Sequence, residues 1–255
     1  MVDEKLREIE REYGVKVLYA CEAGSRAYGL ANEASDYDVR FIYVHPLDWY
    51  LSIDEKRDVI EMPISDQLDM SGWELRKALH LLRKSNPSIL EWLHSDVVYD
   101  EDEDFMNALR NITQKAFNPI AVLHHYHKMA KRNLKEMGQG NEVAVKKYLN
   151  VVRPVLMCSM IMKCGHFPGT NIQYVVNALI LNKHLKEELS SLLETKTCRP
   201  SQTKIDRLSL VDAFIKEQME EIEFYLRDAE GESVNIKEEL SDLFRSTVKQ
   251  GEESE

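Results

Sequence analysis

Hydrophobic and polar residues follow two different periods along the chain, a strand-like one first and a helical one later. Val2–Tyr13 has the spacing of a short amphipathic helix, which Gly14 ends. Residues 15–21 are a β-branched and aromatic run of strand length. Tyr37–Val44 alternates between two faces, so it predicts a second strand. One face carries Val39, Phe41 and Tyr43, and the other carries Asp38, Arg40 and Ile42.

A further pair of strands is predicted before the period changes. Residues 59–64 and 65–70 have strand patterns, and Gly72 closes the second. From Trp73 onward the apolar residues recur at helical spacing. Beyond an acidic loop at residues 100–104, long amphipathic helices are predicted over residues 119–137, 142–164, 171–181, 185–193 and 208–227.

These patterns predict an α+β fold with two domains. Residues 1–112 would form a small mixed β-sheet with flanking helices, and residues 113–255 an α-helical C-terminal domain with an acidic tail. The tail, residues 228–255, holds nine acidic and three basic residues, so we expect it to be solvated and partly disordered.

Composition narrows the classes of function. The 33 Lys and Arg against 44 Asp and Glu give a net charge of −11, which argues against a protein that coats nucleic acid through bulk charge. Residues 124–153 nevertheless hold seven bases and two acids, a pattern that suits either a phosphate ligand or a solvated helix face. The chain has no apolar run long enough for a membrane span, and its four cysteines lack C-x-x-C spacing. We expect a soluble, cytoplasmic protein with no membrane partner.

The residues most suggestive of chemistry lie between residues 24 and 39. Asp36 and Asp38 are one residue apart at the start of a predicted strand, so their side chains leave the same face. Two such carboxylates suit Mg²⁺ or Mn²⁺, which prefer oxygen ligands, and a pair of ions there would activate a hydroxyl and stabilise leaving pyrophosphate. Upstream, Gly24 permits close backbone approach, and Ser25 begins a short helix that can hold a triphosphate.

Each part alone is also typical of an ordinary solvated strand edge or turn. Together, a strand, a Gly-Ser turn, a short helix and Ser35-Asp36-Tyr37-Asp38 resemble the signature of the polymerase-beta nucleotidyltransferase superfamily. That resemblance implies a third carboxylate from a neighbouring strand. The candidates are Glu61, Asp66 and Asp69, and Asp69 is favoured because it stands between two apolar residues on a predicted strand. It would ligate the metal or act as general base.

A narrower resemblance extends over residues 18–200. It rests on the phrases SDYDVRFIYV, GWELRKALHLLRKSNP, LEWLHS and KKYLNVVRP. They are similar to the predicted nucleotidyltransferases of the RlaP or YcgL-like family, which gene context has linked to RNA repair. The resemblance implies a transferase that uses an NTP and has a helical C-terminal region, with a poorly defined acceptor.

The basic segment offers candidate phosphate ligands. Lys131 lies on the polar side of the predicted helix 119–137, while Lys147, Tyr148 and Arg153 lie in the family-like KKYLNVVRP phrase. Arg40 shares a strand face with Asp38, so it suits either a carboxylate partner or a phosphate. The alternative for these residues is a solvated surface role.

The sequence therefore predicts a metal-dependent nucleotidyltransferase that moves an NMP from an NTP to an acceptor hydroxyl and releases pyrophosphate. The acceptor would be an RNA end, a small molecule or a protein, with RNA favoured by the family resemblance. The alternatives are a nucleotide-binding or sensing module without catalysis, and a structural helical interaction protein. The preferred NTP and the oligomeric state stay open.

Overall fold

The computed structural model describes residues 1–63, 67–199, 202–229 and 234–250. The chain forms two compact units. The sheet unit comprises Met1–Gly24, Asp36–Phe117 and Ser233–Glu255, and the helical unit comprises Ser25–Ser35 and Asn118–Glu232. A mixed sheet with helices and a largely helical second part confirm the predicted α+β class. These units differ from a single division at residue 112. Ser25–Ser35 belongs to the helical unit, and Ser233–Glu255 belongs to the sheet unit.

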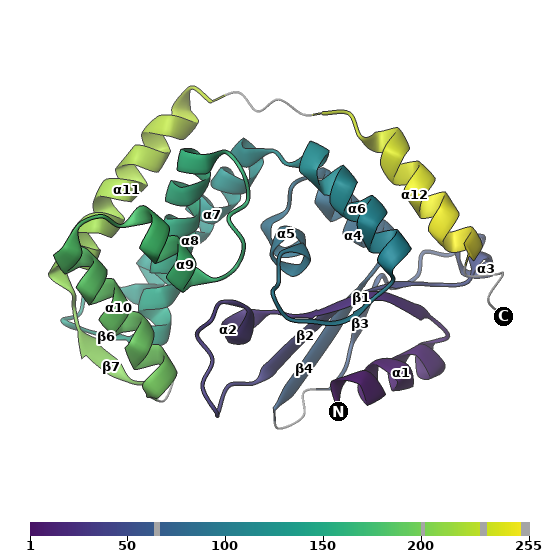
Figure 1. Cartoon of the computed structure of the whole chain (residues 1–255), viewed down its shortest axis with the longest axis horizontal. Helices are drawn as coiled ribbons and strands as arrows, with labels where there is room; N and C mark the ends of the chain where they lie inside the picture. The colour runs from purple at the N-terminus through teal and green to yellow at the C-terminus, as the bar shows by residue number, and fades with distance from the viewer. Residues whose placement is uncertain (64–66, 200–201, 230–233, 251–255) are drawn as a thin grey trace. The chain divides into compact units, whose positions relative to one another are not determined.

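The sheet unit is built on five strands in the order β3-β4-β2-β1-β5 (Figure 1). The strands are β1 (Lys16–Glu22), β2 (Tyr37–Val44), β3 (Val59–Glu61), β4 (Leu68–Glu74) and β5 (Val98–Glu101). β2 and β4 are parallel, and the other neighbouring pairs are antiparallel. The parallel pair puts the starts of β2 and β4 at the same edge of the sheet, and this edge carries the carboxylates.

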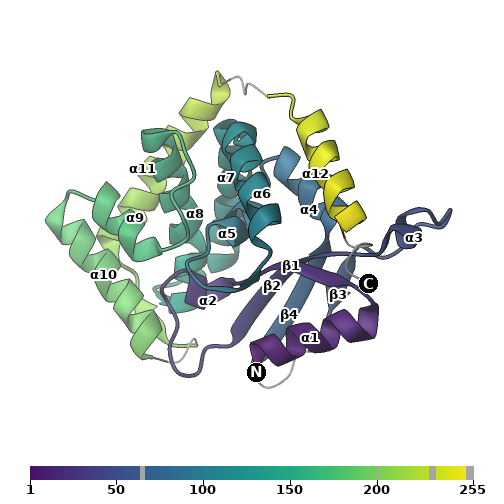
Figure 2. The same ribbon diagram turned by 45° about the vertical axis from the view of Figure 1, so that its right-hand side comes forward.

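Helix α1 (Val2–Tyr13) covers one face of this sheet, as both ribbon views show (Figures 1 and 2). Its buried residues Val2, Leu6 and Ile9 belong to one apolar cluster with Val39, Phe41 and Tyr43 of β2. Gly14 ends the helix with φ 60°, as predicted. The opposite face of β2, with Asp38 and Arg40, is therefore turned away from α1, and the predicted division of the strand into two faces is confirmed.

The remaining helices of the sheet unit are α3 (Leu47–Tyr50), α4 (Leu75–Arg83), α5 (Pro87–Leu93), α6 (Glu103–Ala116) and α12 (Lys237–Gln250). Trp92 of α5 stacks on Trp73 of β4 with ring centroids 3.8 Å apart. Because Trp73 and Asp69 are four residues apart on one strand, α5 packs on the face that carries the carboxylates.

Three sequence predictions for this unit are corrected. Trp73 and Glu74 continue β4 instead of opening a helix, and Glu74 caps α4 by accepting hydrogen bonds from two backbone N–H groups. Asp100 and Glu101 belong to β5 instead of a loop. Residues 237–250 of the acidic tail form a helix because Leu240, Leu243 and Val248 give it an apolar face, which packs against α4 and α6. The predicted strand ends at residues 64–66 lie outside the described residues.

The helical unit contains α7 (Pro119–Met137), α8 (Val145–Cys164), α9 (Ile172–Leu179), α10 (Lys183–Cys198) and α11 (Ser209–Arg227). The prediction of a helix from residue 142 was wrong at its start. Residues Glu142–Ala144 form β6, which pairs with β7 (Lys204–Asp206) in an antiparallel ladder that sequence periodicity does not reveal. Among the described residues, no helix is long and apolar enough to cross a membrane.

Candidate active site

The central feature of the sheet unit is a pair of carboxylates on neighbouring parallel strands. Asp38 of β2 lies in register with Asp69 of β4, so the two side chains leave the same face about 4.8 Å apart along the sheet. Both are half-buried, with side-chain exposed fractions of 28% and 32%. Asp36 lies directly before β2 and is exposed. The structure thus brings two of the three predicted carboxylates together.

A guanidinium bridges these two carboxylates. The Nη2 of Arg40 lies 2.8 Å from Asp69 Oδ2 and 3.4 Å from Asp38 Oδ1. The Nη1 donates to the backbone carbonyl oxygen of Asp69 at 3.1 Å. Of the two roles considered for Arg40, the structure contains the carboxylate partner. The pair of carboxylates therefore already holds one positive charge between its oxygens.

Gly24 lies so close to the Asp38 carboxylate that there is no room for a side chain at position 24. A Cβ built on Gly24 would lie 1.9 Å from Asp38 Oδ2 and 2.7 Å from its Cγ. Gly24 also has φ +57°, which favours glycine over any residue with a side chain. The backbone N–H of Ala23 donates to the Asp38 carbonyl oxygen at 2.8 Å. These contacts fix the carboxylate against the turn that follows β1.

A buried glutamate supports the same strand start, and sequence reasoning missed it. Glu22 is 0% exposed, and its Oε1 accepts the Asp38 N–H at 2.8 Å. Its Oε2 accepts a hydrogen bond from the Tyr99 hydroxyl, and its carbonyl oxygen accepts one from Ser95 Oγ at 2.7 Å. A buried carboxylate needs such partners to offset lost hydration. The signal in the sequence was a glutamate directly after an apolar strand run.

The neighbouring thiol of Cys21 is buried in the core of the sheet unit. Cys21 lies opposite Arg40 in the β1–β2 ladder and is 0% exposed. Burial raises the pKa of the Cys21 thiol to about 12, and the approach of Glu22 raises it as well. The thiol therefore keeps its proton near neutral pH and is a core residue.

Of the three candidates for a further carboxylate, the geometry favours Asp69. Glu61 lies on the edge strand β3, opposite Ser71, and forms an exposed ion pair with Arg57. One strand therefore separates Glu61 from β2, whereas Asp69 lies directly beside Asp38. Asp66 lies outside the described residues.

Ser25 begins the short segment that the sequence placed before the carboxylates. Helix α2 (Gly24–Ala27) has four residues, as a short helix was expected. The carbonyl oxygen of Ser25 accepts the Leu30 N–H at 2.8 Å, and Thr170 Oγ1 donates to the Ala27 carbonyl oxygen at 2.9 Å. This anchors the segment within the helical unit. A triphosphate contact by Ser25 stays a prediction.

The predicted cationic ligands belong to the helical unit and have different surroundings. The guanidinium carbon of Arg153 lies 4.3 Å from the centre of the Tyr28 ring. Tyr28 follows Ser25 by three residues. Lys131 forms an ion pair with Glu223 at 3.0 Å. Lys147 is exposed, and its Nζ donates to the Glu136 carbonyl oxygen at 3.4 Å. Phosphate binding by Arg153, Lys131 and Lys147 stays a prediction.

Tyr148 does not have the accessibility that a nucleotide ligand needs. It is 0% exposed, and its hydroxyl donates to Asp212 Oδ1 at 2.6 Å. Burial, followed by this hydrogen bond, raises the pKa of the Tyr148 hydroxyl above its usual value. This burial disfavours Tyr148 as a nucleotide ligand, and that role stays a prediction. Tyr148 lies on the buried face of α8, together with Leu149 and Val152.

The described side chains at this site include the oxygen ligands that a divalent cation prefers, but their present arrangement does not form a complete metal site. Within the described ranges, no group of three or more His, Cys, Asp or Glu side chains is placed to hold a metal ion. The Asp38 and Asp69 carboxylates already gather around one cationic group, and carboxylate oxygens are the ligands that Mg²⁺ prefers. The pair therefore fits the donor set of a hard cation that would take the place of the Arg40 guanidinium.

Comparison with known proteins identifies the family. Residues 1–246 match the family model RlaP, described as the RNA repair pathway DNA polymerase beta family. The chain belongs to this family. It is also 45% identical over 250 residues to "Uncharacterized protein YcgL" of Bacillus subtilis (strain 168), covering 98% of this chain and 96% of that protein. The family resemblance inferred from the sequence phrases is thereby confirmed.

A solved structure with low similarity was also found. It is a nucleotidyltransferase-like protein from Exiguobacterium sibiricum 255-15, with a TM-score of 0.34 and 12% sequence identity. The match covers 98% of this chain and 80% of that chain.

Proposed function

We propose that this RlaP family member is a nucleotidyltransferase that moves an NMP from an NTP to an acceptor hydroxyl. The observation that supports it most is the register of Asp38 and Asp69 on neighbouring parallel strands, with Gly24 held against Asp38. A solvated strand edge would not require a glycine at this close approach. Such placement holds a carboxylate in one position, which catalytic groups require.

In this proposal Asp36, Asp38 and Asp69 would hold Mg²⁺ or Mn²⁺. A divalent cation bound there would supply positive charge to the attacking hydroxyl and to the leaving pyrophosphate. Glu22 acts as a positioning residue, since its carboxylate fixes the backbone N–H of Asp38. Arg40 would exchange its carboxylate partners for a phosphate oxygen of the NTP.

The proposed reaction is a single displacement at the α-phosphorus. The acceptor oxygen forms a bond to this phosphorus, and the bond to the oxygen that bridges the α- and β-phosphates breaks. The electron pair of that bond leaves with pyrophosphate. The proton of the acceptor hydroxyl passes to a carboxylate, for which Asp69 is the proposed base.

RNA is the proposed acceptor, because the family description names an RNA repair pathway. Small molecules and proteins remain alternative acceptors. The net charge of −11 requires that an RNA end be bound by local contacts instead of by the bulk charge of the protein.

The test is to incubate the protein with each of four labelled NTPs, Mg²⁺ and a panel of RNA, small-molecule and protein acceptors. The wild type should release pyrophosphate and label one acceptor class. Asp38→Asn and Asp69→Asn should each lower the rate by about 10²-fold or more. The matched control is Glu61→Gln, which removes an exposed carboxylate of the same sheet and should keep the wild-type rate.

Two outcomes would contradict the proposal. An active Asp38→Asn, Asp69→Asn double variant would exclude a catalytic role for the pair. An inert wild type whose unfolding temperature still rises with NTP would identify a nucleotide-binding module without catalysis.

A further inference from the structure

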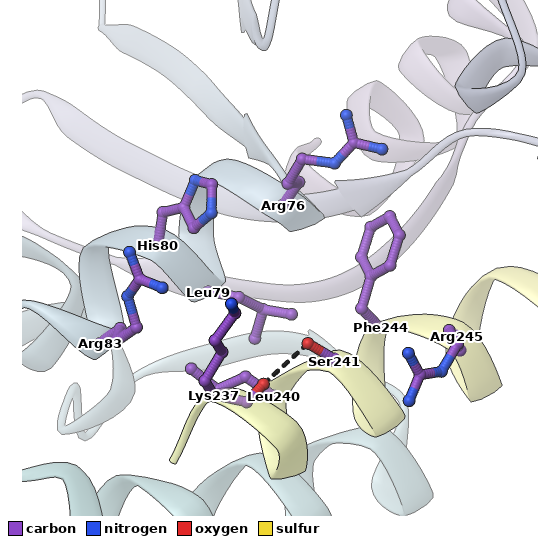
Figure 3. A pocket seen from close by; sticks show the side chains of 9 residues that line it. All are labelled: Arg76, Leu79, His80, Arg83, Lys237, Leu240, Ser241, Phe244 and Arg245. Atoms are coloured by element: carbon purple, nitrogen blue, oxygen red, sulfur yellow. Dashed lines mark hydrogen bonds between the residues drawn. The ribbon is translucent and has the colours of Figure 1, made fainter. Parts of the chain in front are cut away.

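A second concave site lies in the sheet unit between helices α4 and α12. It is a cavity of about 390 Å³, within the size range of small-molecule sites. Figure 3 shows side chains of both helices facing one another across it. Its lining includes the basic side chains of Arg76, Arg83, Lys237 and Arg245, together with the imidazole of His80.

Among the described residues, the lining of this cavity carries several positive charges and no carboxylate. Acidic residues nevertheless outnumber basic ones in the whole chain by 44 to 33. Among the residues that the structure describes, the side chains of Arg76, His80, Arg83 and Lys237 form no ion pair. Arg245 does form one, with Asp242. These side chains are exposed to solvent, and a bound anion would lower the mutual repulsion of the arginines and the lysine.

One of these cations is held in place by aromatic rings. The guanidinium carbon of Arg76 lies 5.2 Å from the ring centre of Tyr50 and 5.2 Å from that of Phe244. The Tyr50 hydroxyl donates to Glu74 Oε1 at 2.6 Å, which fixes the ring. A guanidinium held against aromatic rings in this way keeps its N–H donors, which suit the oxygens of a phosphate.

The wall beneath the cations is apolar. Leu79 of α4 and Leu240 of α12 line the cavity and are buried, and the ring of Phe244 lies beside them. A cavity with an apolar floor and a few convergent polar groups is typical of a ligand site.

The cavity is distinct from the carboxylate site. Asp69 lies at the beginning of β4, and α4 follows the end of the same strand at Glu74. Five strand residues at about 3.3 Å each separate them by roughly 16 Å. The two sites therefore occupy opposite ends of one strand of the sheet unit.

We propose that the cavity between α4 and α12 binds the phosphate groups of a nucleotide or of an RNA strand. Arg76, Arg83 and Lys237 provide the phosphate contacts, and Phe244 offers an aromatic surface beside them. The shared chemistry is a phosphate next to a flat apolar group. This proposal does not depend on transfer activity, because it concerns a binding site without carboxylates.

The experiment follows the side-chain NMR resonance of His80, which lines the cavity and is therefore sensitive to a ligand bound there. His80→Gln assigns the signal. The full-length protein, in buffer without divalent cations, is titrated with inorganic pyrophosphate, with ATP and with a short single-stranded RNA. A saturable shift with pyrophosphate and ATP identifies free phosphate compounds, and a shift with RNA at much lower concentration identifies a strand.

The variant Arg83→Gln, Lys237→Gln removes two cavity cations, and the affinity should fall about tenfold or more. The control is Lys84→Gln, Lys249→Gln, which removes the same charge from exposed positions near and on the same two helices, outside the cavity. The control should keep wild-type affinity. Single Arg83→Gln serves if the double variant has a lowered unfolding temperature.

The proposal is overturned if none of the three ligands shifts His80, or if the cavity variant and the control bind equally. Its failure is separate from that of the proposed function, which is read from pyrophosphate release by the Asp38 and Asp69 variants. A chain that transfers nucleotide but shows no response at His80 keeps the first proposal and loses this one.

Discussion

The close approach of Gly24 to Asp38 gives a prediction that separates backbone strain from displacement of the carboxylate. In Gly24→Ala the new Cβ would lie 1.9 Å from Asp38 Oδ2, whereas real Cβ contacts stay above 3.0 Å. The carboxylate oxygen therefore has to move by about 1 Å, because the other near atoms belong to the same side chain. The movement also disturbs the 3.4 Å contact between Arg40 and Oδ1 of the same carboxylate.

Two contributions set the size of the effect, the backbone strain of the new alanine and the displacement of the Asp38 carboxylate. Alanine at φ +57° carries a backbone strain of about 1–2 kcal/mol, which lowers the free energy of unfolding. A reacting group displaced by about 1 Å costs about 10²-fold in rate. Gly14 provides the matched control, since it has φ +60° but no atom within 4 Å of the added Cβ. Gly14→Ala therefore carries the strain without the displacement.

The assay measures the rate of pyrophosphate release at saturating NTP and Mg²⁺, together with urea unfolding. Both variants should lose about 1–2 kcal/mol of unfolding free energy. Gly24→Ala should also lose about 10²-fold in rate, while Gly14→Ala keeps the wild-type rate. A rate for Gly24→Ala within about twofold of that for Gly14→Ala would refute the reasoning.

Three further predictions concern burial and charge. Tyr148→Phe should cost about 1–3 kcal/mol in urea unfolding, because Asp212 loses its hydroxyl donor, with KM for NTP unchanged; a raised KM would restore Tyr148 as a ligand. Burial raises the pKa of Cys21 and of Cys158 from 9.0 to about 12, so the folded state keeps protons that the unfolded state loses. The stabilising contribution of the two buried thiols is fully present below pH 9. Above pH 9 the free energy of unfolding should fall by up to about 1.4 kcal/mol per pH unit for each thiol. In Cys158→Ala this fall should be less steep when unfolding is measured from pH 8 to 11. Arg40→Gln removes the guanidinium between the two carboxylates, so Mg²⁺ should raise the unfolding temperature of this variant more than that of the wild type; equal responses would contradict competition for the pair.

The sequence by itself determined features that depend on residues close together in the chain. The strand Tyr37–Val44 and the helix Pro119–Met137 have the predicted bounds, because strand alternation and helical spacing involve neighbours within four residues. The end of α1 at Gly14 followed from the conformational freedom of glycine. The spacing of Asp36 and Asp38 before and within one strand was also local.

Only the tertiary structure decided which distant residues meet. The parallel pairing of β2 with β4 made Asp69 the neighbour of Asp38, 31 residues away, and excluded Glu61 from that position. Strand register depends on how two segments pair, and periodicity within either segment cannot fix it. For this reason the sequence left three candidates for the third carboxylate, and the strand register favoured Asp69.

Burial was likewise a tertiary outcome. Tyr148 looks like a ligand in a basic phrase, but the packing of α8 hides it, and Glu22 looks like a strand end, but neighbouring groups enclose its carboxylate. Helix α12 returns to the sheet unit from the far end of the chain and completes the cationic cavity with α4. Its charges predicted a solvated tail, while its apolar face, which needs a partner surface to be buried, determined its position.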